Sequence, residues 1–334
     1  MYLEFEIRRI DCAKCGKVKT EKIPFLANNP FYTERFAQYV GQRCRSSSIL
    51  AVAKELRLDW QTVKSLEMDY MREQLERAGP PTPRAIGVDE ISIRKGHTYR
   101  IVVSDLEKGR AIWFGGDGRK EDDMAKFYES IGKQASSNIE VAVMDMWKPF
   151  RNAAQAYAPQ AQIVFDKFHI MAHLGKAMDA VRKAEYARLT GEDRRYIKGQ
   201  KYTLLSHREN LSLEGRKALK QLLAANKRLN TAYLLKEQFG QLWNYRTAAG
   251  ARKFFERWRE ALKWQRLKPY ERFADMIERH WDGIVSYCTP KNKVALGFVE
   301  GLNNKIRVIQ RRAYGLRDEE YLRLKILTCQ LPEL

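Results

Sequence analysis

Three carboxylates in this chain stand where one element gives way to the next. Asp89 closes the apolar run AIGVDEISI, Asp145 closes IEVAVMD, and Glu300 begins a basic helix far downstream. Two like charges a few Å apart are costly unless a cation lies between them. Carboxylate oxygens suit Mg²⁺ or Mn²⁺, and two such ions about 3.5–4 Å apart can activate a water or a 3′-hydroxyl for phosphodiester displacement. The three residues are therefore candidate ligands of a two-metal site.

Each aspartate also has a purely structural interpretation. Asp145 could cap a helix that begins at Lys148, and Asp89 could pair with Arg94 or Lys95. Aspartates at strand ends are common, so either position alone is a weak signal.

Other carboxylates compete for the same role. We interpret Asp105 and Asp117 as turn residues. Asp166 also ends an apolar run, and His169 follows it closely. We predict that Asp166 and His169 are auxiliary groups, which position a phosphate or stabilise the fold near the site.

The strand pattern that must position the two aspartates lies in residues 85–173. Three short β-branched or aromatic runs predict an antiparallel meander. Helices and strands then alternate to give the order β-β-β-α-β-α-β-α, which predicts a mixed sheet with helices on its faces. The first and fourth strands can be neighbours in such a sheet, which would bring Asp89 and Asp145 side by side.

Residues 174–285 show helical patterns, no strand signal and most of the positive charge. Within them, residues 181–272 hold 23 Lys and Arg against 9 Asp and Glu, so +14 of the net +20 lies in this block. Aromatic residues in such a segment are more often core than base-stacking wedges. We expect this of Trp243, Trp258, Trp264 and Trp281.

Residues 31–78 predict a short helix from about Ile49 to Leu56, a break, and a longer helix from about Gln61. The tight turn between them is typical of a helix-turn-helix, whose second helix enters the major groove. A plain helical hairpin has the same periodicity. In the DNA-binding interpretation, the exposed contact residues are Trp60, Gln61, Thr62, Lys64 and Ser65. The Pro-rich stretch 79–84 predicts a linker.

Residues 1–30 contain Cys12-Ala-Lys-Cys15-Gly, which is one knuckle of a zinc ribbon. Structural zinc takes four ligands, and this stretch supplies two. The other three cysteines are isolated in helical patterns. Cys12 and Cys15 are therefore a partial zinc site, and a remnant that binds no metal is an equal alternative.

The overall charge favours a nucleic-acid partner. The chain has 61 Lys and Arg against 41 Asp and Glu, with a pI of 9.7. An excess that is spread over folded helices is typical of nucleic-acid binders. Solvated lysines or contact with anionic lipid are the alternatives. No apolar run approaches the ~18–20 residues that span a bilayer, and no signal peptide opens the chain. We therefore expect a cytoplasmic protein without a membrane partner.

The β-β-β-α-β-α-β order is that of the ribonuclease-H-like fold, and the order Asp89, Asp145, helical insertion, Glu300 resembles a DDE transposase. More narrowly, the chain resembles the bacterial insertion-sequence transposases of the ISL-three family. The segments that carry this resemblance are IGVDEISIRKGHTY, VAVMDMWKPF, IVFDKFHI and VEGLNNKIRVIQRRAYGLRD. They span about 86–325, and a helix-turn-helix behind a zinc ribbon is also the family's N-terminal layout. The family's ribbon carries two Cys pairs, and only one is present here.

The resemblance implies a fold class and a domain layout. The fold would be an α/β ribonuclease-H-like mixed sheet with a large all-α insertion, preceded by the helix-turn-helix region. Residues 85–173 and 286–334 would form the catalytic domain. Residues 174–285 would be an insertion that clamps DNA and helps to build an assembly.

The resemblance also implies a reaction. Asp89 and Asp145 would hold Mg²⁺ or Mn²⁺ ions, and Glu300 would complete the shell. The enzyme would cut double-stranded DNA at the terminal inverted repeats of its element and join the freed 3′-hydroxyl to target DNA. Two element ends require two active sites, so a homodimer or a larger assembly on DNA is expected.

Basic residues near these positions are candidate DNA contacts. They are Arg94, Lys95, Lys148, Lys305, Arg307, Arg311 and Arg312. The last four follow Glu300 on one predicted helix, for which a solvated face is the alternative.

Two other functions fit the same residues. A structure-specific nuclease, such as a junction resolvase, would cut DNA without joining it, but it has little use for a helix-turn-helix. A repressor with an inactive nuclease domain would bind DNA without chemistry, but all three proposed ligands are present.

Overall fold

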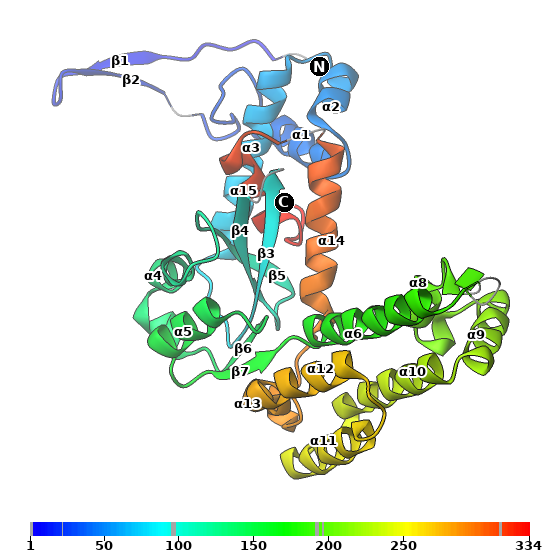
Figure 1. Ribbon diagram of the computed structural model, residues 1–334. Coiled ribbons are helices and arrows are strands. Elements are labelled where there is room, and N and C mark those ends of the chain that lie inside the picture. The colour runs from blue at the N-terminus through cyan, green and yellow to red at the C-terminus, as the bar shows by residue number, and fades with distance from the viewer. Residues whose placement is uncertain (1–2, 22, 95–97, 191–193, 196, 314–315) are drawn as a thin grey trace. The chain divides into compact units, whose positions relative to one another are not determined.

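The computed structural model describes residues 3–21, 23–94, 98–190, 194–195, 197–313 and 316–334 (Figure 1). Within those ranges, no helix has the length and apolar character that crossing a membrane requires. The chain divides into two compact units, Pro81–Asn303 and Met1–Pro80 with Asn304–Leu334. Each unit has a hydrophobic core of its own.

The unit Pro81–Asn303 contains a five-stranded mixed sheet. Its strands are β3 (Ala85–Arg94), β4 (Thr98–Asp105), β5 (Arg110–Gly115), β6 (Val141–Met144) and β7 (Gln162–Phe165). Their order is β5-β4-β3-β6-β7; β4 pairs antiparallel with β3 and β5, and β6 pairs parallel with β3 and β7. The predicted meander is confirmed, and so is the neighbourhood of the first and fourth strands.

Helices make up the rest of this unit. They are α4 (Glu121–Ser137), α5 (Lys148–Tyr157), α6 (Lys167–Arg188), α8 (Lys201–Leu205), α9 (Leu213–Ala225), α10 (Lys227–Phe239), α11 (Ala248–Leu262), α12 (Lys268–Arg279), α13 (Trp281–Ser286) and the part of α14 (Gly297–Arg312) up to Asn303. Three short 3-10 turns also occur, at Arg208–Asn210, Gly240–Asn244 and Pro290–Asn292.

Different parts of the chain cover the two faces of the sheet. Side chains alternate along a strand, so Ile86 and Val88 point to one face, where they pack with α4 and α5. Ala85 points to the other face, in a smaller core with Val299 of α14. Gly87 makes this second contact possible, because a Cβ atom there would lie 2.6 Å from Val299 Cγ2.

The described residues from α6 to α13 form helices and no strand, as predicted, and their core is aromatic. The Phe239 ring lies 5.0 Å from that of Trp258 and 4.9 Å from that of Phe273. Trp243 and Trp258 are buried in this core, in line with the prediction. Trp264 departs from it: the side chain is 92% exposed, because the residue stands in the short turn between α11 and α12 with a φ of 71°.

The second unit carries the predicted helix-turn-helix. Its elements are β1 (Arg9–Cys12), β2 (Lys17–Thr20), α1 (Glu34–Ser46), α2 (Ile49–Leu56), α3 (Trp60–Ala78), the rest of α14, and α15 (Glu319–Thr328). The side chains of Thr33, Ser48 and Asp59 cap the first turns of α1, α2 and α3, which satisfies amide groups that would otherwise lack partners. Arg57, with a φ of 52°, ends α2 and makes the tight turn into α3.

Residues 304–313 and 316–334 pack with these N-terminal helices, whereas the resemblance implies that 286–334 belong to the catalytic domain. The physical reason is the apolar face of α15, where Tyr321 and Leu324 are buried in one core with α1, α2 and α3. Glu300 remains in the unit that contains the sheet.

A buried ionic cluster joins α15 to α3. Glu67 is 1% exposed and accepts hydrogen bonds from the Tyr321 hydroxyl, at 2.5 Å, and from Lys325 Nζ. Lys325 Nζ also donates to the carbonyl oxygen of Cys44 in α1, at 2.9 Å. Burial raises the pKa of Glu67, and the neighbouring ammonium and phenol groups oppose that shift. The helix-turn-helix therefore depends on the C-terminal helix for the partners of its one buried carboxylate on α3.

We predict that Lys325→Met lowers the free energy of unfolding of this unit by about 3 kcal/mol, because it leaves Glu67 buried without its cation. A carboxyl group with a raised folded-state pKa stabilises the fold below its unfolded pKa and loses that contribution as the pH rises through the folded pKa. The loss should therefore be larger at about pH 8 than at about pH 5.

Thermal unfolding of the full chain, followed by circular dichroism at both pH values, measures this effect. Lys54→Met is the matched control, since Lys54 is exposed on α2 and its loss removes the same charge. Equal effects of the two substitutions would contradict the prediction.

Candidate active site

Asp89 and Asp145 lie opposite each other because β3 and β6 pair in parallel. The last residue pair of that ladder is Gly87 with Val143, and each aspartate lies two residues further along. Because side chains alternate, both carboxylates extend from the sheet face that Val299 of α14 covers.

The prediction that Asp89 closes its strand is wrong. Strand β3 continues to Arg94, where it is still paired with β4. The carboxylate nevertheless stands at an edge, because β6 pairs with β3 only over Ala85–Gly87.

A third aspartate and a histidine join this pair. Asp166 lies one residue beyond the last β6–β7 pair, as Asp145 does, and it caps α6 by accepting a hydrogen bond from the Phe168 amide at 3.0 Å. Nδ1 of His169 lies 3.6 Å from Asp145 Oδ2, and its Nε2 lies 3.9 Å from Asp89 Oδ1 and 4.0 Å from Asp166 Oδ2. One imidazole therefore stands among three carboxylates, which we call the aspartate cluster.

Asn303 of α14 holds the Asp89 side chain. Its Nδ2 donates to Asp89 Oδ2, and the Glu90 amide donates to Oδ1 at 2.7 Å. Asn303 is 8% exposed, and in the described part of the chain its Oδ1 is buried without a hydrogen-bond partner. The sequence shows Asn303 only as a polar neighbour of basic residues, because 214 positions separate it from Asp89.

Burial raises the pKa of Asp89 and of Asp166. For Asp89, hydrogen bonds from the Glu90 amide and Asn303 and the nearby His169 oppose this shift, whereas the Asp145 charge adds to it. The cluster is therefore a place where positive charge is stabilising.

Glu300 lies on α14 one turn before Asn303, and its side chain is exposed. Its membership of the site stays a prediction. Across the described residues, no group of three or more His, Cys, Asp and Glu side chains is arranged to hold a metal ion. On α14, Asn303 donates a hydrogen bond to Asp89.

The donors that do meet fit a divalent cation in their chemistry. Asp89 and Asp145 offer carboxylate oxygens, and Asn303 offers an amide oxygen; all are ligands that Mg²⁺ and Mn²⁺ prefer. The orphaned Oδ1 of Asn303 supports the fit, because a buried acceptor without a partner is costly.

Arg119, which no pattern in the sequence indicates, supports the segment after Asp145. Arg119 Nη1 lies 2.6 Å from Glu90 Oε1. Its guanidinium group stacks over the rings of Tyr99 and Trp147, at 4.6 and 5.2 Å. Trp147 Nε1 in turn donates to the Arg119 carbonyl at 2.8 Å. No local pattern signals this network, since its members come from four separate segments.

The helix-cap interpretation of Asp145 is wrong. Trp147 precedes α5, and no side chain caps that helix. Asp145 Oδ1 instead accepts from the amide of the next residue, Met146, at 2.6 Å.

The basic residues predicted to contact DNA differ in their surroundings. Arg94, Lys148 and Arg311 are exposed, and Lys95 lies outside the described residues. Lys305 donates to the carbonyl of Cys329 at 2.5 Å, and Arg312 donates to that of Arg45 at 2.8 Å. Arg307 contacts the neighbouring Asn304 at 3.1 Å.

Three of the five predicted major-groove residues, Trp60, Gln61 and Ser65, are exposed on α3. The predicted exposure of Lys64 is wrong: its side chain is 14% exposed, and its Nζ lies 2.7 Å from Asp318 Oδ2. The cause is Asp318, the residue that caps α15 and is distant in sequence. Thr62 is partly buried.

The cysteine pair lies at the tip of the β1–β2 hairpin. The amides of Cys15 and Gly16 donate to the Cys12 carbonyl, at 3.1 and 2.8 Å, and Gly16 has the positive φ of 63° that this turn requires. The turn has the form of a knuckle with two sulfur atoms.

Comparison with known proteins gives the family of this chain. Residues 86–326 match a family model described as a transposase, of the DDE type of family ISL3. Residues 21–70 match the helix-turn-helix domain of transposase family ISL3. The chain belongs to the ISL3 family of transposases.

Two transposases of insertion sequence elements align over nearly the whole chain. A transposase for insertion sequence element IS1001 of Bordetella parapertussis is 34% identical over 322 residues, which is 96% of this chain and 79% of the relative. A transposase for IS1557 of Mycobacterium tuberculosis is 25% identical over 346 residues, which is 96% of this chain and 77% of the relative. The ISL3 match at 86–326 includes all three aspartates of the cluster, Asn303 and Glu300.

We predict that Asn303→Ala weakens Mn²⁺ binding to the full chain by about 10–100-fold, the effect typical of losing a group that orients a ligand. Isothermal titration with Mn²⁺ measures the affinity. Asn304→Ala is the matched control, because Asn304 is exposed on the same helix. Unchanged Mn²⁺ affinity in the Asn303 variant would rule out this role.

Proposed function

We propose that this ISL3-family chain is a metal-dependent DNA transposase with a ribonuclease-H-like catalytic domain. It binds the terminal inverted repeats of its element through the helix-turn-helix, cleaves the DNA, and joins the 3′-hydroxyl to a target. The observation that carries the proposal is the juxtaposition of Asp89 and Asp145 on adjacent parallel strands. The reaction takes place on bacterial DNA in the cytoplasm, in a homodimer or larger assembly that brings two ends to two active sites.

The site residues have distinct roles in this proposal. When bound, Mg²⁺ or Mn²⁺ supplies the Lewis acidity that phosphodiester displacement needs. Asp89 and Asp145 hold the ions from the sheet, and Glu300 is the third carboxylate, contributed by α14. Asn303 keeps the Asp89 carboxylate in one orientation.

His169 and Asp166 serve as supporting groups. His169 faces Asp145 at 3.6 Å, and it can donate a hydrogen bond to a phosphate oxygen or to a carboxylate there. Asp166 fixes the first turn of α6, on which His169 stands. Lys148 and Arg94, exposed beside the two aspartate strands, contact the phosphate backbone.

The first test is Asp145→Asn. It should lower metal-dependent cleavage of DNA that carries the element's ends by about a thousandfold, or roughly 4 kcal/mol of transition-state stabilisation. DNA affinity should stay the same or rise, because a negative charge is removed. Cleavage is followed on gels with Mg²⁺, with Mn²⁺ and with a chelator, and a pre-cut 3′-end reports strand transfer.

The outcome also separates the rival functions. Cleavage without strand-transfer product would indicate a structure-specific nuclease, and specific binding without cleavage would indicate a repressor. Loss of DNA binding and cleavage together would mark Asp145 as structural. Intact cleavage in a Glu300→Gln variant would show that Glu300 is not the third carboxylate of the site.

The second test concerns end recognition. Gln61→Ala or Ser65→Ala should weaken binding to the terminal repeat by about 1–3 kcal/mol and leave binding to unrelated DNA nearly unchanged. Fluorescence anisotropy with both DNAs measures the difference. Equal losses on the two DNAs would show that α3 does not read bases.

A further inference from the structure

A groove of about 530 Å³ runs along α6 in the unit Pro81–Asn303. One side consists of α6 residues at helical spacing, from Phe168 to Lys183, and the other comes from α8, the residues after it, and α10. At 1.5 Å per residue, the α6 side is about 22 Å long. Its floor is mostly apolar or small, as at Met171, Gly175 and Leu205.

The rim of this groove is basic. Four lysines line the groove against one carboxylate, that of Asp179. Asp179 is already neutralised, since it lies 2.7 Å from Arg182 and 3.2 Å from Lys183. Lys176 and Lys201 are exposed and form no ion pair with any described residue. The groove therefore offers positive charge that nothing in this part of the chain balances.

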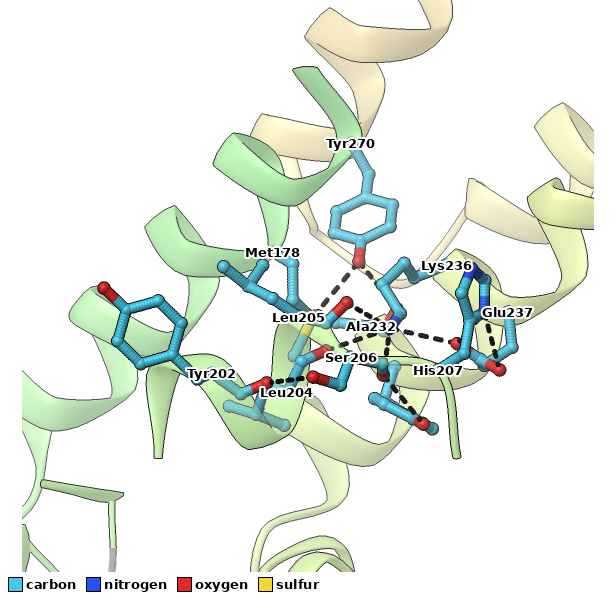
Figure 2. A network of polar contacts seen from close by, with 11 residues as sticks. Met178, Tyr202, Leu204, Leu205, Ser206, His207, Ala232, Lys236, Glu237 and Tyr270 are labelled. Atoms are coloured by element: carbon cyan, nitrogen blue, oxygen red, sulfur yellow. Dashed lines mark hydrogen bonds and ion pairs between the residues drawn. The ribbon is translucent and has the colours of Figure 1, made fainter. Parts of the chain in front are cut away.

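The buried Lys236 fixes one wall of the groove in place (Figure 2). Lys236 Nζ donates to the carbonyls of Leu204, Leu205 and Ser206, at 3.0, 3.2 and 2.9 Å. These carbonyls close the C-terminal end of α8, where a cation is favourable. Nζ also lies 2.9 Å from Glu237 Oε1. These contacts occupy the ammonium group of Lys236 and fix α8 to α10. This wall of the groove is therefore preformed.

The groove begins beside the aspartate cluster. Phe168, at its end, is half exposed, and its ring meets that of His169 edge-on at 5.7 Å between centroids. His169 is the residue that faces all three aspartates. A linear polymer bound along the groove and past Phe168 would therefore reach the carboxylates of the aspartate cluster.

We propose that this groove, here called the α6 groove, binds a single strand of DNA that leads to the aspartate cluster. An apolar floor with cationic rims and an exposed aromatic ring is the arrangement that takes unpaired bases and their phosphates. A duplex keeps its bases inside and would leave the floor uncovered. The proposal rests on the DNA-processing function proposed above, and it adds a path for one strand.

Binding of a labelled oligothymidylate to the full chain, in a chelator that prevents cleavage, tests the proposal. The double variant Lys176→Ala/Lys201→Ala should bind about tenfold more weakly, and the slope of log affinity against log salt should fall by about 1.4, or 0.7 for each lost phosphate contact. The matched control is Lys217→Ala/Lys220→Ala, which removes the same charge from exposed positions on α9 and should leave the affinity and slope unchanged.

A second variant tests the aromatic end of the groove. Phe168→Leu keeps an apolar side chain but removes the stacking surface, and it should weaken oligothymidylate binding by roughly tenfold without changing the salt slope. Phe31→Leu is its control, because Phe31 is exposed and does not line the groove.

If both lysine double variants lose the same oligothymidylate affinity, the effect comes from diffuse surface charge, and the proposal is overturned. Full affinity in the Lys176/Lys201 or the Phe168 variant would also overturn it. These binding measurements need no cleavage. If the protein binds oligothymidylate as expected but does not cut DNA, the proposed activity is refuted and the groove is not. If the protein cuts DNA but the variants bind with full affinity, only the groove is refuted.

Discussion

Repulsion among the carboxylates of Asp89, Asp145 and Asp166 is the interaction on which the rest of the site depends. The parallel ladders of β3, β6 and β7 place these side chains on one sheet face, and no lysine or arginine is paired with them among the described residues. In the part of the chain that the structure describes, they face an imidazole, an amide and backbone N–H groups. The neighbouring elements must therefore be rigid enough to hold like charges together, and α14 contributes to this by packing closely over Gly87.

Much of the architecture follows from local patterns, and the parts that do not are contacts across long sequence separations. The runs of β-branched residues predict the meander and the later parallel strands, and the capping residues Ser48 and Asp59 fit the helix-turn-helix. The pairing of Asp89 with Asp145 follows from strand order alone. The length of β3 beyond Asp89 does not, because antiparallel pairing with β4 extends the strand past the carboxylate.

The third carboxylate marks the limit of reasoning from the sequence. Glu300 and Asn303 stand three residues apart on one helix, and both are chemically reasonable neighbours for a metal-binding aspartate. That Asn303 reaches Asp89 depends on the rotation of α14, which Val299 sets by packing on the sheet. Lys64 is a second example of a long-range contact. Its position on α3 predicts a DNA contact, but its ammonium group pairs with Asp318, 254 residues away in the sequence.

The cluster of Glu67, Tyr321 and Lys325 has a consequence for the order in which the protein is made. The buried carboxylate on α3 finds its phenol and ammonium partners only after α15, 254 to 258 residues further along, has been translated. The helix-turn-helix therefore reaches its final packing only after the whole sheet-containing unit has been synthesised. A nascent polypeptide that still lacks α15 would carry Glu67 without its partners, so maturation of the helix-turn-helix is coupled to translation of a distant segment.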